Sequence, residues 1–130
     1  MEKRDGLPAG RQGFFKHQLK SFNFAIEGII FSFKSGLHFK FHILALIMVI
    51  IFGLYFSISQ FEWLVIILIS SAVISAEAMN TALEQTCNVL HPEDHSVVRL
   101  AKHCAAGGVL ILSVAAILIG LIIFIPKIFG

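Results

Sequence analysis

The sequence predicts an all-α membrane protein, in which an amphipathic surface helix precedes three transmembrane helices. Hydrophobic residues account for 57% of the 130 residues and charged residues for 14%, whereas soluble domains average about 45–50% apolar and about 25% charged residues. The apolar residues also gather in long runs, and a run of about 20 residues crosses a hydrocarbon core of about 30 Å. A net charge of +2 gives no indication of nucleic-acid binding. The length suits one domain, which we expect at residues 14–130.

The N-terminal region is expected to contain an arm and a helix unlike the spans. Residues 1–13 hold three glycines, one proline and five charged residues, a composition that predicts a disordered arm. At about residues 16–35, apolar residues recur at spacings of three and four, which places them on one helical face. They are Leu19, Phe22, Ile26, Ile29 and Phe33. Lysines at the other positions favour a helix that lies flat on the inner membrane surface.

Three apolar runs predict the membrane spans, at about residues 41–58, 61–82 and 104–125. The third run contains no charged residue. Helix-favouring residues persist beyond the second run as far as Leu90, until His91 and Pro92 end them. The second helix should therefore extend out of the membrane into the cytoplasm. A polar loop should follow it, and the last helix is expected to begin at Val97 or Val98.

The distribution of Lys and Arg predicts the topology. Seven of these residues precede the first span, residues 57–62 contain none, and only Lys127 follows the third span. Positive charges stay on the cytoplasmic side, so the N-terminus should be cytoplasmic and the C-terminus outside. We therefore expect a multi-pass protein of the inner (cytoplasmic) membrane. Cys87 and Cys104 should lie on the cytoplasmic side, where thiols stay reduced.

A stripe of polar side chains occupies one face of the second helix where it leaves the membrane. Its members stand at i, i+3, i+4, i+7 and i+11: Glu77, Asn80, Thr81, Glu84 and Asn88. A carboxylate at the edge of the hydrocarbon costs a few kcal/mol and marks a functional site. Glu84 suits a hard cation such as Mg²⁺, and Lys102 offers a charge for phosphate from the start of the last helix.

Two sequence blocks resemble the prokaryotic diacylglycerol kinase and undecaprenol kinase family. Residues 75–84, SAEAMNTALE, match the family signature E-x-x-N-[ST]-A-[IL]-E, and residues 95–110, HSVVRLAKHCAAGGVL, resemble its second block. The resemblance covers about residues 14–125. It implies a membrane lipid kinase with three spans per subunit, which works as a homotrimer with sites shared between neighbours. ATP with Mg²⁺ would phosphorylate a lipid alcohol, diacylglycerol or undecaprenol, at the cytoplasmic face.

The same resemblance assigns roles to residues by position. Glu77 would be the general base toward the lipid hydroxyl, and Asn80 would help it to position the substrate. Glu84 would bind the Mg²⁺ of ATP. The ATP and phosphate site would comprise Glu84, Lys102, His103 and Asn88.

The chain departs from the family pattern at three positions. The family usually has Asp where this chain has Asn88, Asp where it has His103, and a metal-binding Glu where it has Gly36. Three missing carboxylates would weaken the binding of Mg²⁺ and ATP. An alternative is therefore a catalytically weakened or inactive family member that acts as a membrane partner.

Two further alternatives follow from the residues alone. Cys87, His91 and His95 are spaced by four, and His103-Cys104 follows, so a cytoplasmic-side zinc site is conceivable. Pro92 interrupts the helix, however, so the first three cannot share one regular face. The second alternative is a small transporter, in which the carboxylate of Glu77 would relay protons.

Overall fold

The computed structural model describes residues 11–130, which form four helices. They are α1 (Arg11–Ser35), α2 (Leu37–Tyr55), α3 (Gln60–Leu90) and α4 (Ser96–Phe129). The predicted all-α fold is confirmed, as is the continuation of the second span as one helix to Leu90. Of the predicted disordered arm, residues 1–10 lie outside the described residues, and Arg11 already begins α1. The last helix begins at Ser96, slightly earlier than expected.

The chain divides into two compact units, one ending at Phe31 and the other covering residues 32–130. In the first unit, the apolar residues that the sequence assigned to one helical face are strongly exposed; Leu19 and Phe22, for example, are 66% and 67% exposed. No buried residue occurs in α1 before Ser32 among those whose burial is described. Residues 14–31 of this helix are all exposed, polar and apolar alike, so a position on the membrane surface stays a prediction.

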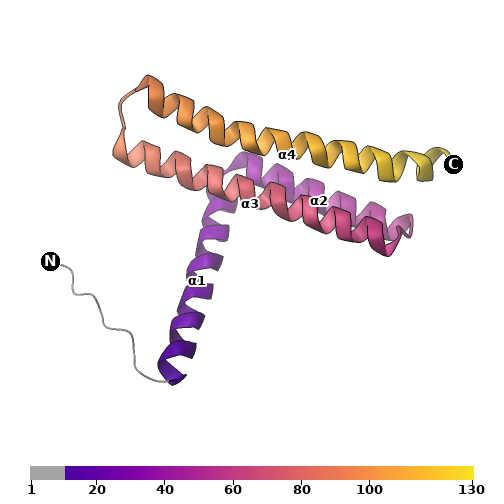
Figure 1. The fold of residues 1–130 in the computed structure, drawn as a ribbon, viewed down its shortest axis with the longest axis horizontal. Helices are drawn as coiled ribbons and strands as arrows, with labels where there is room; N and C mark the ends of the chain where they lie inside the picture. Colours follow the sequence, from indigo (N-terminus) through magenta and orange to yellow (C-terminus); the bar gives the residue numbers. More distant parts are fainter. Residues whose placement is uncertain (1–10) are drawn as a thin grey trace. The chain divides into compact units, whose positions relative to one another are not determined.

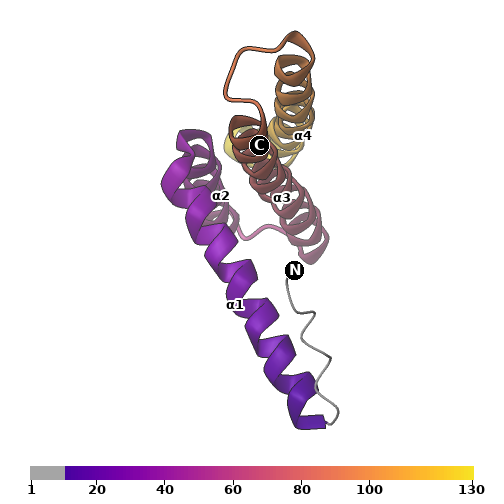
Figure 2. The same ribbon diagram turned by 90° about the vertical axis from the view of Figure 1, so that its left-hand side faces the viewer.

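In the second unit, α3 is the central helix. It packs most extensively against α4 and less against α2, and Figure 2 shows it between the two. All three helices are long and apolar enough to cross a membrane. Large apolar side chains face outward along them; Leu68 and Ile122 are 74% and 73% exposed. Such a surface is stable in lipid rather than in water, and this unit is an integral membrane domain.

The two ends of this unit differ. Figure 1 shows the α2–α3 turn and the C-terminus at one end, which we call the hairpin end, and the α3–α4 loop at the other, which we call the polar end. The hairpin end comprises residues 49–66 and 119–127, and the polar end residues 77–103. The buried apolar cluster lies at the hairpin end: Ile58, Ile66, Ile123 and Phe124.

Close packing and polar contacts fasten the hairpin end. A Cβ on Gly53 would come within 2.6 Å of the Trp63 ring, so only glycine lets α2 approach α3 there. Ser59 caps α3, because its hydroxyl accepts the backbone N–H of Glu62 while the Glu62 carboxylate accepts that of Ser59. Lys127 near the end of α4 forms an ion pair with Glu62 at 3.3 Å.

Candidate functional site

The polar stripe predicted on α3 passes from the interior of the helical unit to its surface. Glu77, Asn80 and Thr81 are 4%, 7% and 6% exposed, Glu84 is half-buried, and Asn88 is exposed. The stripe exists because residues three, four and seven apart share a helical face, and α3 remains a regular helix through all of them. A buried carboxylate thus connects to the surface through a continuous row of polar groups.

Glu77 is buried without a polar partner. Among residues 11–130, no hydrogen bond or salt bridge reaches its carboxylate. The residue as a whole is 4% exposed, and its carboxylate oxygens are not among the fully buried unpartnered atoms of the described residues; carboxylates in membrane spans usually serve a function. The carboxylate of Glu77 is therefore available to a group from outside the chain.

Asn80 lies between Glu77 and Glu84 along the stripe. Its Nδ2 donates a hydrogen bond to Oε1 of Glu84 at 3.3 Å. Its Oδ1 is buried and has no hydrogen-bond partner in the part of the chain that the structure describes. Buried acceptors are nearly always satisfied in folded proteins, and this oxygen retains its capacity to accept a hydrogen bond.

Lys102 joins the stripe from α4. Its Nζ donates a hydrogen bond of 2.6 Å to Oδ1 of Asn88, across the loop that connects α3 and α4. Within the loop region, Arg99 holds Asp94 through two hydrogen bonds of 2.8 and 3.1 Å. Lys102 thus lies beside the polar stripe, and its contact there is with Asn88. The sequence did not indicate this contact.

Two positions that the resemblance involves bring no ligand to this region. His103 is exposed and makes no contact with the stripe among the interactions found in residues 11–130. Gly36 is the N-cap residue of α2 and carries no side chain where the family has Glu. Within the described residues, no three His, Cys, Asp or Glu side chains gather into a metal site.

The residues present nevertheless fit a magnesium ion that arrives with a nucleotide. Mg²⁺ keeps several waters and is usually held by one or two carboxylates together with substrate phosphates. The half-buried carboxylate of Glu84 and the unpartnered Oδ1 of Asn80 are oxygen donors on the same face of α3. Such a donor set is too small for an ion held by protein alone and adequate for one that phosphate also holds.

The cysteine and histidine residues do not form the zinc site that was considered as an alternative. His91 ends α3 in a non-helical conformation, which removes it from the face of Cys87, as the interruption at Pro92 predicted. The rings of His91 and His95 lie 5.9 Å apart, and no third ligand joins them within residues 11–130.

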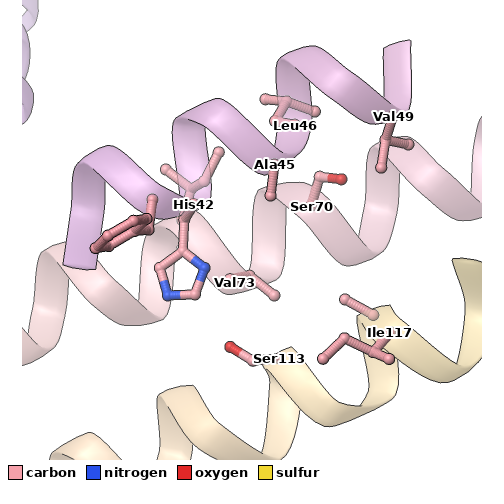
Figure 3. A pocket seen from close by; sticks show the side chains of 11 residues that line it. His42, Ala45, Leu46, Val49, Ser70, Val73, Ser113 and Ile117 are labelled. Carbon is pink, nitrogen blue, oxygen red and sulfur yellow. The ribbon is translucent and has the colours of Figure 1, made fainter. Parts of the chain in front are cut away.

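The sequence did not predict a cleft of about 270 Å³ that lies between α2, α3 and α4. His42 and Ala45 of α2, Ser70 and Val73 of α3, and Ser113 and Ala116 of α4 line it. Figure 3 shows the ring of His42 and the hydroxyl of Ser113 directed into the space between their helices. The available signal was the occurrence of isolated polar residues inside apolar runs.

Comparison with known proteins identifies relatives over most of the chain. The family described as prokaryotic diacylglycerol kinase matches residues 23–124. An undecaprenol kinase of Bacillus subtilis is 37% identical over 108 residues, which cover 83% of this chain and 88% of the relative. A diacylglycerol kinase of Synechocystis is 30% identical over 109 residues, which cover 83% of this chain and 62% of the relative. No solved structure matches.

Proposed function

The chain belongs to the prokaryotic diacylglycerol kinase family and is a lipid kinase, and we propose that it transfers the γ-phosphoryl group of ATP to a lipid alcohol. The acceptor is diacylglycerol or undecaprenol, the lipids named for its relatives. The reaction takes place at the cytoplasmic face of the inner membrane. The single observation that carries the proposal is the buried, unpartnered Glu77 in one stripe with the Asn80–Glu84 pair.

In this mechanism, Glu77 accepts the proton of the lipid hydroxyl as the hydroxyl oxygen attacks the γ-phosphorus. The bond between the γ-phosphorus and the bridging oxygen breaks, and ADP leaves with the electron pair. Phosphoryl transfer depends mainly on alignment and on charge neutralisation. Asn80 orients the reacting groups through its unpartnered Oδ1.

The nucleotide end of the site consists of Glu84 and Lys102, with Asn88 beside them. Glu84 would hold Mg²⁺, which neutralises phosphate charge when it is bound. One of the three N–H donors of Lys102 forms a hydrogen bond with Asn88, so two donors remain for phosphate oxygens. Asn88 thereby orients the ammonium group toward the stripe, and the exposed His103 follows at the edge of the site.

We also propose a homotrimer in which neighbouring subunits complete each site. The small number of oxygen donors that one chain supplies at the polar end supports this assembly, as do the large apolar surfaces that its helices leave uncovered. Chemical cross-linking of the purified protein in detergent tests the assembly. A series of cross-linked species that ends at three copies supports the homotrimer, whereas a series that ends at one or two copies contradicts it.

The activity test compares wild-type protein with Glu77→Gln and with Glu93→Gln, a matched change at an exposed loop carboxylate. Each protein in mixed micelles receives radiolabelled ATP, Mg²⁺ and either diacylglycerol or undecaprenol. Transfer to lipid by wild type and Glu93→Gln but not by Glu77→Gln supports the proposal. The absence of transfer by wild type to either lipid would favour the non-catalytic alternative, for which the residues at positions 36, 88 and 103 argue.

A further inference from the structure

The cleft between α2, α3 and α4 lies on the same face of α3 as the polar stripe, about one helical turn from Glu77. Ser70, Val73 and Ile74 line the cleft, and they stand seven, four and three residues before Glu77, on the same face of α3. At 1.5 Å of rise per residue, the α3 lining of the cleft begins about 5 Å from Glu77 along the helix and ends about 10 Å from it. It lies on the side of Glu77 that faces the hairpin end.

The opposing wall on α4 is aligned in the same way. Lys102, Val109, Ser113 and Ala116 are separated by seven, four and three residues, so Lys102 and the cleft residues share one face of α4. On both helices, one face therefore carries polar groups at the polar end and the cleft lining deeper in the membrane domain. A molecule with a polar head and a hydrocarbon tail matches this arrangement.

The chemistry of the lining suits a hydrocarbon chain. Ser113 donates its hydroxyl to the backbone oxygen of Val109 at 2.8 Å, so its proton is satisfied within its own helix. Apart from His42 and Ser70, the remaining lining is apolar. Phe41 and Ile117, which also line the cleft, are 59% and 62% exposed, so the cleft opens to the surface of the unit and a lipid chain can enter from the bilayer.

We propose that this cleft binds a segment of one hydrocarbon chain of the lipid substrate while the substrate hydroxyl lies beside Glu77. The inference rests on the proposed function, because it assumes that the hydroxyl is the acceptor. A volume of about 270 Å³ is slightly below the roughly 300–1,000 Å³ typical of pockets for whole ligands. The cleft accommodates part of one hydrocarbon chain and not two chains side by side. It would therefore bind a polyprenyl chain or a single acyl chain.

The gain from this contact is packing rather than the hydrophobic effect. A lipid chain in the bilayer is already surrounded by hydrocarbon, so helices and lipids associate there through van der Waals contacts. Filling a preformed space restores contacts that the lining would otherwise lack. The cleft therefore acts mainly by alignment, holding the chain so that the hydroxyl meets the carboxylate.

Photolabelling tests chain binding without requiring turnover. The probe is a diacylglycerol with a diazirine at about the sixth carbon of one acyl chain, a depth that corresponds to the rise from Glu77 to the cleft. A matched probe carries the diazirine at the chain end. Full-length Glu77→Gln protein without ATP is irradiated with each probe. We expect the first probe to label residues 41–49, 70–74 and 113–117 preferentially, and the second probe to label them less.

Cleft-filling variants provide the second measurement. Ala116→Phe from α4 and Ala45→Phe from α2 should each lower labelling by the first probe roughly fivefold. In an otherwise wild-type chain, each should raise KM for a long-chain alcohol by a similar factor while kcat changes less. Ala115→Phe, beside the cleft lining on the same helix, is the control and should match the unsubstituted protein.

Uniform labelling of all lipid-facing segments by the first probe would overturn the inference, and so would equal labelling of Ala116→Phe and Ala115→Phe. Loss of cross-linking between copies in Ala116→Phe, together with unlabelled cleft residues, would also overturn it and assign the cleft to a neighbouring subunit. Labelling of the cleft without any phosphorylation by wild type would reject the proposed function alone. Phosphorylation without such labelling would reject the inference alone.

Discussion

The hairpin end and the polar end of the three-span unit are built in opposite ways. At the hairpin end, Gly53 lets the Trp63 ring contact α2, and Glu62 satisfies both the cap of α3 and the ammonium of Lys127. At the polar end, by contrast, Glu77 and the Oδ1 of Asn80 are buried without partners. The same helix α3 runs through both ends. Close packing and satisfied polar groups thus gather at one end, and the groups that a ligand could satisfy gather at the other, as is typical of functional sites.

The largest expected effect is on the rate of phosphoryl transfer, and it comes from a substitution at the polar end that should leave stability unchanged. Glu77→Gln keeps the size and burial of the side chain but removes the base, so the rate of phosphoryl transfer should fall roughly 10²- to 10⁴-fold. The midpoint of thermal unfolding in detergent should not fall, because the carboxylate has no partner to lose. A radiolabel transfer assay and an unfolding curve on the same preparation measure both quantities. Full turnover by this variant would refute the assignment of Glu77 as base.

A substitution at the hairpin end should have the opposite effect, lowering stability without altering the use of ATP. In Gly53→Ala the new methyl group would meet the Trp63 ring at about the distance given above, 2.6 Å. We expect the free energy of unfolding to fall by about 1–3 kcal/mol, with KM for ATP unaltered in the protein that stays folded. Gly120→Ala is the control, because its methyl group would meet no atom within 4 Å. Equal stability of the two variants would show that the approach of α2 to α3 is not close.

The next effect concerns the nucleotide. Lys102→Ala removes a cation that Asn88 orients, so KM for ATP should rise roughly tenfold, the low end for loss of a hydrogen bond to a charged group. Steady-state rates over a range of ATP concentrations measure this. Lys127→Ala is the matched control at the hairpin end and should leave KM for ATP unaltered. If the two lysine variants behaved alike, the polar end would not be the nucleotide site.

The smallest expected effect is a change in thermal stability, and it distinguishes the helix cap from the ion pair at the hairpin end. Glu62→Ala removes both the reciprocal cap with Ser59 and the ion pair, whereas Lys127→Met removes only the ion pair. The thermal midpoint should fall slightly in both variants and further in Glu62→Ala. The contribution of the ion pair should also decrease at high salt. A larger loss in Lys127→Met would mean that the ion pair matters more than the cap.

Helix positions and the polar stripe were accessible from the sequence because both depend on local periodicity. The prediction of helix as far as Leu90 was correct, since Pro92 and the residues before it determine where α3 ends. The start of α4 at Ser96 rather than Val97 or Val98 is a difference of one or two residues, which is usual for helix ends.

The contacts between helices were not accessible in the same way. Asn88 was considered only as a lost carboxylate, and its hydrogen bond to Lys102 depends on how α4 returns along α3 after the loop. The cleft depends on residues from three helices, and their relative rotation and depth have no signature in any one segment. His103 follows Lys102 directly, yet one residue of helix turns it about 100° away, and it is exposed.

For this protein, the sequence by itself determined which segments are helices, which of them can span a membrane, and which residues form the polar face of α3. Each of these properties repeats along one segment and needs no partner. The tertiary structure alone decided that Glu77 and the Oδ1 of Asn80 are buried without partners, that Lys102 meets Asn88, and that a cleft begins one turn from Glu77. These properties arise where the surfaces of separate helices meet, and the fit of side chains across those surfaces sets their geometry.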